Sequence, residues 1–147
     1  MADTYPEVLA ISFQKGGTGK TFTSLNIAGG LAARGFDVLV IDLDPQGTLT
    51  ANLGKRDLYK DLDALSLDEI LLDPKNWDEV NDIILTDHKE FDIIPSNQTY
   101  NGNKTPLDSA DAGENRLGRL LQRVEDDYHY VVCDCPPDFS PYAKNAV

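Results

Sequence analysis

The residues best suited to chemistry lie near the N-terminus, in the glycine-rich segment Phe13-Gln14-Lys15-Gly16-Gly17-Thr18-Gly19-Lys20-Thr21. An apolar run, residues 8–11, precedes it and a helical pattern begins near Lys20, which predicts a strand, a turn and a helix in that order. Three glycines within four positions let backbone N–H groups surround a phosphate, because no side chain blocks its approach. Lys20 is placed to reach the outer phosphates of a nucleotide, and the Thr21 hydroxyl to join a Mg²⁺ shell.

The loop departs from the ordinary phosphate-binding pattern G-x-x-x-x-G-K-[ST] at its first position, where Gln14 stands instead of glycine. A second lysine, Lys15, opens the loop. This arrangement resembles the deviant Walker A motif of the ParA/MinD ATPases. The resemblance implies that Lys15 reaches across a dimer interface to the nucleotide of the partner subunit, where an extra cation helps to spread developing negative charge. A solvated surface lysine is the alternative for Lys15.

The same resemblance implies which residues hold the nucleotide and which take part in the reaction. Lys15 and Lys20 are expected to be catalytic, together with Asp44 further along the chain. The expected ligands are ATP or ADP and Mg²⁺. The expected nucleotide-binding residues are Lys15, Gly16, Gly17, Thr18, Gly19, Lys20, Thr21 and Phe22.

A second apolar run, residues 36–41, predicts a buried strand that ends at the segment Asp42-Leu43-Asp44-Pro45-Gln46-Gly47. Acids at the carboxyl end of a parallel strand lie where open α/β sheets bind their ligands. The Asp-Pro-Gln-Gly stretch resembles the ParA version of the family rather than the MinD version. By that resemblance Asp44 orients or activates the attacking water, and Asp42 supports the metal shell. The alternative is that both aspartates cap the next turn.

A third candidate acid is Asp134, which ends the apolar run at residues 130–134. An apolar strand that ends in aspartate is the Walker B pattern, in which the carboxylate holds Mg²⁺ or a water bound to it. The prolines that follow stiffen a loop that responds to the γ-phosphate, and Asp-x-Pro-Pro resembles switch II of the family. The metal ligands are therefore expected to be Thr21, Asp42 and Asp134.

The remaining patterns predict a parallel α/β sheet flanked by helices, a P-loop fold, in a single domain that spans residues 1–147. Strands are expected at 7–13, 36–41 and 130–134, with a further strand and its exit loop at 91–97. Helices are expected at 20–34, 66–72 and from 114 to about 124, and one or two amphipathic turns at 76–84. Ser66 and Glu69 predict a capping box at the start of the second of these helices.

Two groups of side chains have a structural and a functional interpretation. The leucines Leu58, Leu62 and Leu65 are interpreted as core contacts rather than as a partner site. The arginines of the last helix are interpreted as a solvated face, and contact with DNA phosphates or with acids of a partner is the alternative. These arginines are Arg116, Arg119 and Arg123.

The composition indicates a globular protein with a strongly acidic surface. The net charge is −12, from 25 acidic and 13 basic residues, whereas ordinary nucleic-acid-binding domains are basic. A surface that repels partners is one explanation of this acidity, and adaptation to a high-salt cytoplasm is the favoured one.

No apolar run is long enough to span a bilayer and no signal peptide is apparent, so we expect the protein in the cytoplasm or on the nucleoid. Cys133 and Cys135 are interpreted as reduced core residues.

The resemblance covers nearly all of this chain, but the chain corresponds only to the N-terminal portion of the family domain. Family members continue through further strand–helix units, which contain the adenine-contacting segment and, in many ParA proteins, the DNA-binding surface. We therefore expect a truncated family domain in which the P-loop strand is left with an unpaired edge.

The function that the resemblance implies is a Mg²⁺-dependent ATPase switch in plasmid or chromosome partition. ATP is expected to join two subunits into a homodimer and hydrolysis to separate them. A centromere-binding partner protein is expected to stimulate hydrolysis, and non-specific DNA to bind through the missing C-terminal part. One alternative is a truncated nucleotide-binding or regulatory module without turnover. Another is a MinD-like membrane-cycling ATPase, which needs a C-terminal amphipathic helix that the sequence does not show, so no membrane contact is expected.

Overall fold

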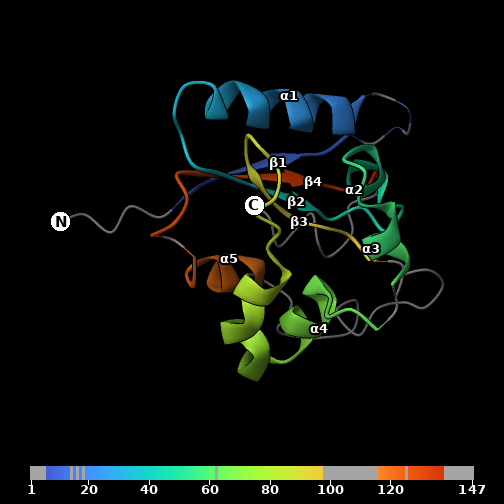
Figure 1. The fold of residues 1–147 in the computed structure, drawn as a ribbon, viewed down its shortest axis with the longest axis vertical. Helices are drawn as coiled ribbons and strands as arrows, with labels where there is room; N and C mark the ends of the chain where they lie inside the picture. Colours follow the sequence, from blue (N-terminus) through green and yellow to red (C-terminus); the bar gives the residue numbers. More distant parts are fainter. Residues whose placement is uncertain are drawn as a thin grey trace.

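A four-stranded sheet forms the centre of the molecule (Figure 1). The computed structural model describes residues 6–13, 15, 17, 19–61, 63–97, 116–124 and 126–137. The strands are β1 (Glu7–Ile11), β2 (Val38–Asp42), β3 (Asp92–Ile94) and β4 (Tyr130–Asp134), arranged in the order β1-β4-β2-β3. Every neighbouring pair in this sheet is parallel, which confirms the predicted α/β class.

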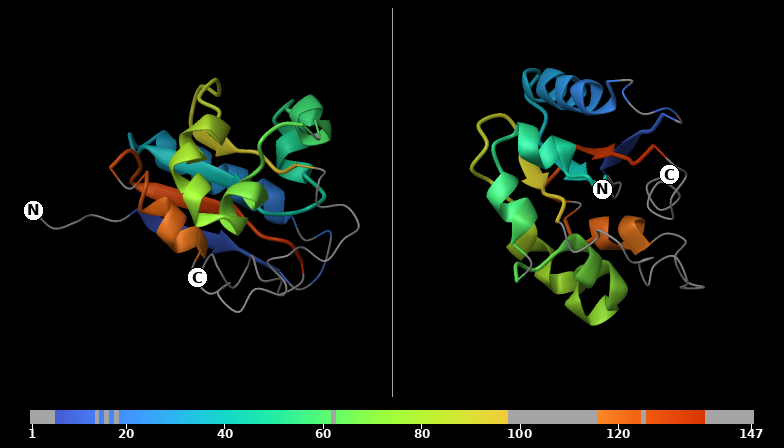
Figure 2. Two further views of the ribbon diagram at one scale, coloured as in Figure 1. Left: turned by 90° about the horizontal axis from the view of Figure 1, so that it is seen from below. Right: turned by 90° about the vertical axis from the view of Figure 1, so that its right-hand side faces the viewer.

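Helices cover both faces of the sheet, as the right-hand view of Figure 2 shows. On one face lies α1 (Lys20–Ala32), and on the other lie α4 (Leu67–Leu72), the 3₁₀ helix η1 (Pro74–Ile83) and α5 (Arg116–Leu121). Two short helices, α2 (Thr48–Asn52) and α3 (Arg56–Lys60), follow the carboxyl end of β2. In the part of the chain that the structure describes, no helix has the length and apolar character needed to cross a bilayer.

The side chains of β2 alternate between two apolar clusters, because successive residues of a strand point to opposite faces. Leu39 and Ile41 belong to the cluster that contains the buried leucines of α4 and α5. Val38 and Val40 belong to the opposite cluster, to which α1 contributes Ala28. All five residues of β2 are buried, as predicted for a strand inside a parallel sheet.

The register of the parallel pairs determines where the strands end. Asp134, the last residue of β4, lies opposite Ile11 on β1 and opposite Asp42 on β2. The segments that follow β1, β4 and β2 therefore begin side by side at the carboxyl edge of the sheet. The strand β1 pairs only with β4 among the described residues, so it stands at the edge of the sheet, as expected for the P-loop strand of this chain.

The predicted elements are present, but several of their ends are shifted. β1 ends at Ile11 rather than at residue 13, and β2 begins at Val38 rather than at residue 36. α1 ends at Ala32 rather than at residue 34, and a turn follows in which Gly35 adopts a φ of 88°. The capping box of α4 is confirmed, because Ser66 and Glu69 each accept the backbone N–H of the other.

The arginines of α5 and of the segment that follows it do not all lie on a solvated face. Arg116 Nη1 donates to the backbone oxygens of Leu71 and Leu72 at 2.8 and 2.9 Å. These carbonyls end α4 and lack helical partners, so Arg116 caps the C-terminus of that helix. The interpretation of Arg116 as a surface residue is therefore wrong, whereas Arg123 is half exposed and pairs with the exposed Asp78.

The leucines within α3 and in the segment that follows it also differ from the prediction. Leu58 and Leu65 are 36% and 37% exposed, so they are not core residues, and Leu62 lies outside the described residues.

The two cysteines agree with the prediction that they are reduced core residues, because Cys133 and Cys135 are both free and buried. Burial raises the pKa of both thiols, that of Cys135 to about 11, which keeps them protonated and unreactive.

Candidate functional site

The glycine-rich loop joins β1 to α1 at the carboxyl edge of the sheet. Gly17 and Gly19 adopt positive φ angles of 75° and 80°, a left-handed conformation that favours glycine. Gly19 is the N-cap of α1, a helix of 13 residues, and as glycine it has no side chain with which to cap the first N–H groups. Those donors suit an anion at the positive end of the helix dipole. Gly16 and Thr18 lie outside the described residues.

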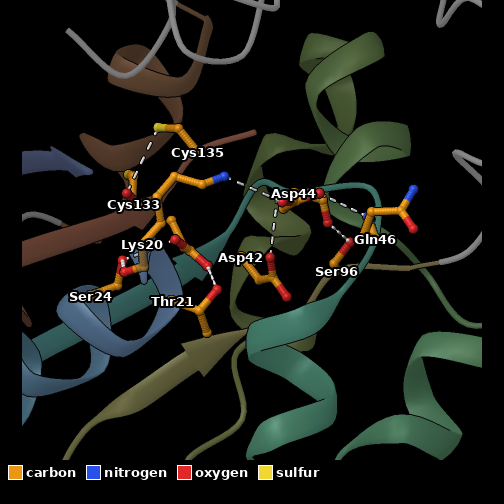
Figure 3. Close-up of polar contacts among 10 residues, drawn as sticks. Lys20, Thr21, Ser24, Asp42, Asp44, Gln46, Ser96, Cys133 and Cys135 are labelled. Carbon is orange, nitrogen blue, oxygen red and sulfur yellow. Dashed lines mark hydrogen bonds and ion pairs between the residues drawn. The ribbon is translucent and has the colours of Figure 1, made fainter. Parts of the chain in front are cut away.

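Lys20, the first residue of α1, points across the edge of the sheet towards the segment that follows β2 (Figure 3). Its Nζ lies 3.7 Å from Asp44 Oδ2, and each residue is 9% exposed. A pair as buried as this is screened by salt less than a surface pair. The structure thus places two of the three predicted catalytic residues, Lys20 and Asp44, against one another.

The carboxylate of Asp134 lies beside the first turns of α1. Thr21 Oγ1 donates to Asp134 Oδ2 at 2.7 Å, and Ser24 Oγ donates to Asp134 Oδ1 at 3.0 Å. Burial raises the pKa of Asp134, and the two hydroxyl donors act in the opposite direction. The sequence analysis missed Ser24, although its spacing of three residues from Thr21 puts both hydroxyls on one face of the helix.

Asp42, at the end of β2, is bonded to the helix that follows it. Its Oδ2 accepts from the Thr50 N–H at 2.9 Å and from Thr50 Oγ1 at 2.6 Å, and its Oδ1 accepts from the Asp44 N–H at 3.2 Å. Burial raises the pKa of Asp42 to about 7; the hydrogen bonds from Thr50 lower it, and the charge of Asp134 raises it. Asp42 therefore fixes the position of α2. Sequence reasoning missed Thr50, since nothing in its separation from Asp42 shows that the chain folds back.

Asp44 opens a tight turn, residues 44–47, which we call the Asp44 loop. Its Oδ1 accepts from the Gln46 N–H at 2.9 Å, and its backbone oxygen accepts from the Gly47 N–H at 2.9 Å. Ser96, which follows β3, also donates from its hydroxyl to this backbone oxygen, at 2.8 Å. The sequence analysis placed the exit of β3 correctly but did not assign Ser96 to the site, because a serine after a strand has no pattern of its own.

Two predicted nucleotide-binding residues stand apart from these contacts. Lys15 is exposed, and Phe22, on the first turn of α1, is 73% exposed. The structure does not bring either side chain to the three aspartates. Their assignments to the nucleotide therefore stay predictions.

The donor set at the edge of the sheet suits a hard cation. Hydroxyl and carboxylate oxygens are the ligands that Mg²⁺ prefers, and Thr21, Asp42 and Asp134 supply them. Thr21 and Asp134 are in direct contact, and Asp42 lies opposite Asp134 in the β2–β4 register. Within the described ranges no group of three or more His, Cys, Asp or Glu side chains is arranged to hold a metal ion, so Mg²⁺ here would need oxygens from a bound phosphate or water as well.

A sizeable cavity among the described residues lies elsewhere. It has a volume of about 400 Å³ and is lined by residues such as Asp37, His88, Glu90 and Tyr128. These residues precede β2, β3 and β4, so the cavity lies at the amino-terminal edge of the sheet. The contacts among Lys20 and the three aspartates, rather than cavity size, therefore identify the candidate site.

Comparison with known proteins agrees with the resemblance to ParA-type proteins. The AAA_31 family, described as an AAA domain, matches residues 6–147. Sporulation initiation inhibitor protein Soj of Bacillus subtilis is 37% identical over 143 residues, which cover 96% of this chain and 54% of Soj. Chromosome partitioning protein ParA of Caulobacter vibrioides is 34% identical over 142 residues, which cover 95% of this chain and 51% of that protein. The chain thus spans about half the length of these relatives.

Solved structures share the fold. A cobyrinic acid a,c-diamide synthase from Mycobacterium smegmatis, with a bound ATP analogue and magnesium, has a TM-score of 0.81 and 32% identity, and the match covers 96% of this chain and 55% of that one. A putative plasmid partition protein from Borrelia burgdorferi bound to AMPPNP has a TM-score of 0.78 and 26% identity, with 96% and 57% covered. The fold of this chain is therefore that of proteins crystallised with adenine nucleotides.

The hydrogen bonds of Thr50 lead to a prediction about stability. We expect Thr50→Val to lower the free energy of unfolding by about 1–3 kcal/mol, because Asp42 loses a donor and the Ser96 N–H loses its acceptor, both in a buried place. Thr50→Ser keeps the hydroxyl and is expected to lose less. Urea unfolding followed by circular dichroism measures both, and equal losses for the two variants would contradict the role of the hydroxyl.

Proposed function

Since this chain belongs to the AAA_31 family of AAA domains, we propose that it is a Mg²⁺-dependent switch of the ParA type that binds and hydrolyses ATP. One observation carries the proposal: the ion pair of Lys20 with Asp44 brings the glycine loop and the loop after β2 to one point of the sheet edge. The hydrogen bond of Thr21 to Asp134 brings the end of β4 to the same helix turn. The nucleotides bound by solved relatives of the same fold support this reading.

In this proposal the start of α1 holds the phosphates. The backbone N–H groups after Gly19 and the ammonium of Lys20 both present positive charge at the N-terminus of the helix. A triphosphate competes with Asp44 for Lys20, because the ammonium cannot contact both fully. Nucleotide binding thereby frees the Asp44 carboxylate from its ion pair. Lys15, Gly16, Gly17, Thr18 and Phe22 complete the proposed nucleotide contacts.

Thr21 and Asp134 are the proposed ligands of Mg²⁺. Asp42, which lies opposite Asp134 in the sheet, is proposed to support this metal site. A bound Mg²⁺ supplies charge neutralisation at the phosphate oxygens. The residues themselves are arranged for this, since Ser24 fixes the second oxygen of Asp134 and Thr50 fixes Asp42. The side chains are thus held in place by the protein before any cation arrives.

Asp44 is the proposed group that acts on water. A water molecule held by its carboxylate is oriented towards the γ-phosphorus, and it gives a proton to that carboxylate as the new P–O bond forms. The bond from the γ-phosphorus to the bridging oxygen breaks, which leaves ADP and inorganic phosphate. Asp44 is 9% exposed, which limits the competition of bulk solvent for its carboxylate.

We further propose that ATP joins two copies of the chain and that Lys15 of one copy contacts the nucleotide of the other. The exposure of Lys15 supports this, because the side chain is available to a partner. A centromere-binding protein that stimulates hydrolysis, DNA bound by the rest of a longer protein, and a place of action in the cytoplasm belong to the same proposal.

A second candidate function is a module that binds nucleotide without turnover. The observation that favours it is that the contacts of Lys20, Thr21 and Asp134 suit the binding of phosphate and cation without requiring any step of hydrolysis. Phosphate release from ATP by the purified chain distinguishes the two functions.

The proposal is tested first by the mass of the protein in solution, measured by light scattering after size exclusion with Mg-ADP and then with Mg-ATP in molar KCl. We expect a monomer with ADP and a dimer with ATP. A mass that does not depend on the nucleotide would contradict the switch within these residues. Calorimetric titration of ATP on the same sample then separates a failure to dimerise from a failure to bind.

The role of Asp44 predicts a separation of binding from hydrolysis. We expect Asp44→Asn to bind ATP with near-normal affinity but to hydrolyse it about a hundredfold more slowly, because the amide is a poor proton acceptor. Asn keeps an oxygen for the Gln46 N–H, so the turn is preserved. Single-turnover phosphate release measures the rate; an unchanged rate would remove Asp44 from the mechanism.

The role of Lys15 predicts a defect in dimers rather than in monomers. We expect Lys15→Ala to weaken the ATP-dependent dimer by about tenfold or more while ATP affinity of the monomer stays close to normal. Lys20→Ala serves as the comparison and is expected to abolish binding of ATP to the monomer. If Lys15→Ala lowers monomer affinity as much as it weakens the dimer, Lys15 acts within its own subunit.

A further inference from the structure

The Asp44 loop is held by side chains from two other parts of the chain, and both act on its backbone. We propose that Ser96 and Tyr59 are positioning residues that fix the Asp44 loop from outside, and so fix the direction of the Asp44 carboxylate. The catalytic meaning of this inference rests on the proposed function. The anchoring itself rests on contacts among described residues.

Ser96 connects the exit of β3 to both ends of the segment that follows β2. Its hydroxyl donates to the backbone oxygen of Asp44 at 2.8 Å, and its N–H donates to Thr50 Oγ1 at 2.9 Å. Thr50 Oγ1 donates in turn to Asp42 Oδ2 at 2.6 Å. The β2–β3 register, in which Ile41 lies opposite Ile94, brings Ser96 beside this segment. Ser96 is 6% exposed, so water does not readily replace these bonds.

Tyr59 holds the far end of the loop from α3. Its hydroxyl donates to the backbone oxygen of Pro45 at 2.9 Å. Its ring packs against Gly47, where an added Cβ would lie 2.3 Å from Cδ2 of the ring, so no larger residue fits without movement. Gly47 also has a φ of 60°, which favours glycine. Ser96 therefore holds the first residue of the Asp44 loop, and Tyr59 contacts its second and fourth residues.

The anchoring of the Asp44 loop has its largest effect on the direction of the Asp44 carboxylate when nucleotide is bound. Among the described residues, the Asp44 carboxylate contacts the Gln46 N–H within the loop and the Lys20 ammonium outside it. A phosphate that takes up Lys20 removes the outside partner. The direction of the freed carboxylate is then set by the backbone of its loop, which Ser96 and Tyr59 hold.

The substitutions Ser96→Ala and Tyr59→Phe each remove one hydroxyl group and keep the rest of the side chain. Each has a matched control with the same change at a hydroxyl that bonds a partner outside the Asp44 loop. Ser66→Ala removes the cap of α4, where the serine bonds Glu69. Tyr128→Phe removes a hydroxyl that donates to Asp92 Oδ2 at 2.7 Å, at the opposite edge of the sheet.

The first measurement is backbone amide hydrogen exchange by NMR on the whole chain, without nucleotide. We expect exchange at Gln46 and Gly47 to be about tenfold faster in Ser96→Ala and in Tyr59→Phe, because these N–H groups bond within the loop. Amides of β2 and β4 should keep their rates, and the two controls should leave the loop unchanged. Unaltered loop exchange, or equal acceleration throughout the chain, overturns the inference.

The second measurement is ATP affinity and single-turnover hydrolysis of the same variants. We expect the hydrolysis rate to fall about tenfold with affinity within twofold of the original chain, since the loop directs Asp44 but does not bind phosphate. An equal loss in the controls, or an unchanged rate in the two variants, overturns a positioning role. If the original chain binds no ATP or does not hydrolyse it, the proposed function fails, and amide exchange alone decides whether the loop is anchored as described.

Discussion

The parallel register of β4 with its two neighbours is the constraint on which the candidate site depends. Because Asp134 lies opposite both Ile11 and Asp42, the strand that precedes the glycine loop and the strand that precedes the Asp44 loop end at one level. A slip of one residue in either pair would turn the terminal aspartates to the other face of the sheet. The buried apolar side chains of β2 and β4 hold this register, since each alternates between two cores.

Three carboxylates gathered at one edge need compensation, and the protein provides most of it with neutral donors. Asp134 has the hydroxyls of Thr21 and Ser24, and Asp42 has Thr50, while Asp44 has the ammonium of Lys20. Neutral donors stabilise a carboxylate less than a cation does, so burial still raises the pKa of Asp42 and of Asp134. The neutral donors therefore stabilise the site, and the incompletely compensated carboxylates still favour the binding of a cation.

The fold and the principal site residues could be predicted because their signals are local. Glycines before a lysine, and apolar runs that end in aspartate, are visible within a few residues of sequence. Ser96, Tyr59 and Thr50 could not be found in this way. The contacts of Ser96 and Tyr59 with the Asp44 loop, and those of Thr50 with Asp42, depend on how β3, α3 and α2 pack. For the same reason Arg116 was misplaced: the carbonyls that it caps belong to α4, 44 or 45 residues earlier in the chain.

In the proposed function, the charge of the site favours joint binding of cation and nucleotide. Lys20 is the ammonium that the structure sets against the carboxylates, and one such charge does not balance three acids. A triphosphate alone would add further negative charge and would be repelled by Asp134 and Asp44. Mg²⁺ alone would find hydroxyl and carboxylate oxygens but too few of them in the described residues. Each ligand supplies what the other lacks, so the arrangement favours the pair over either one.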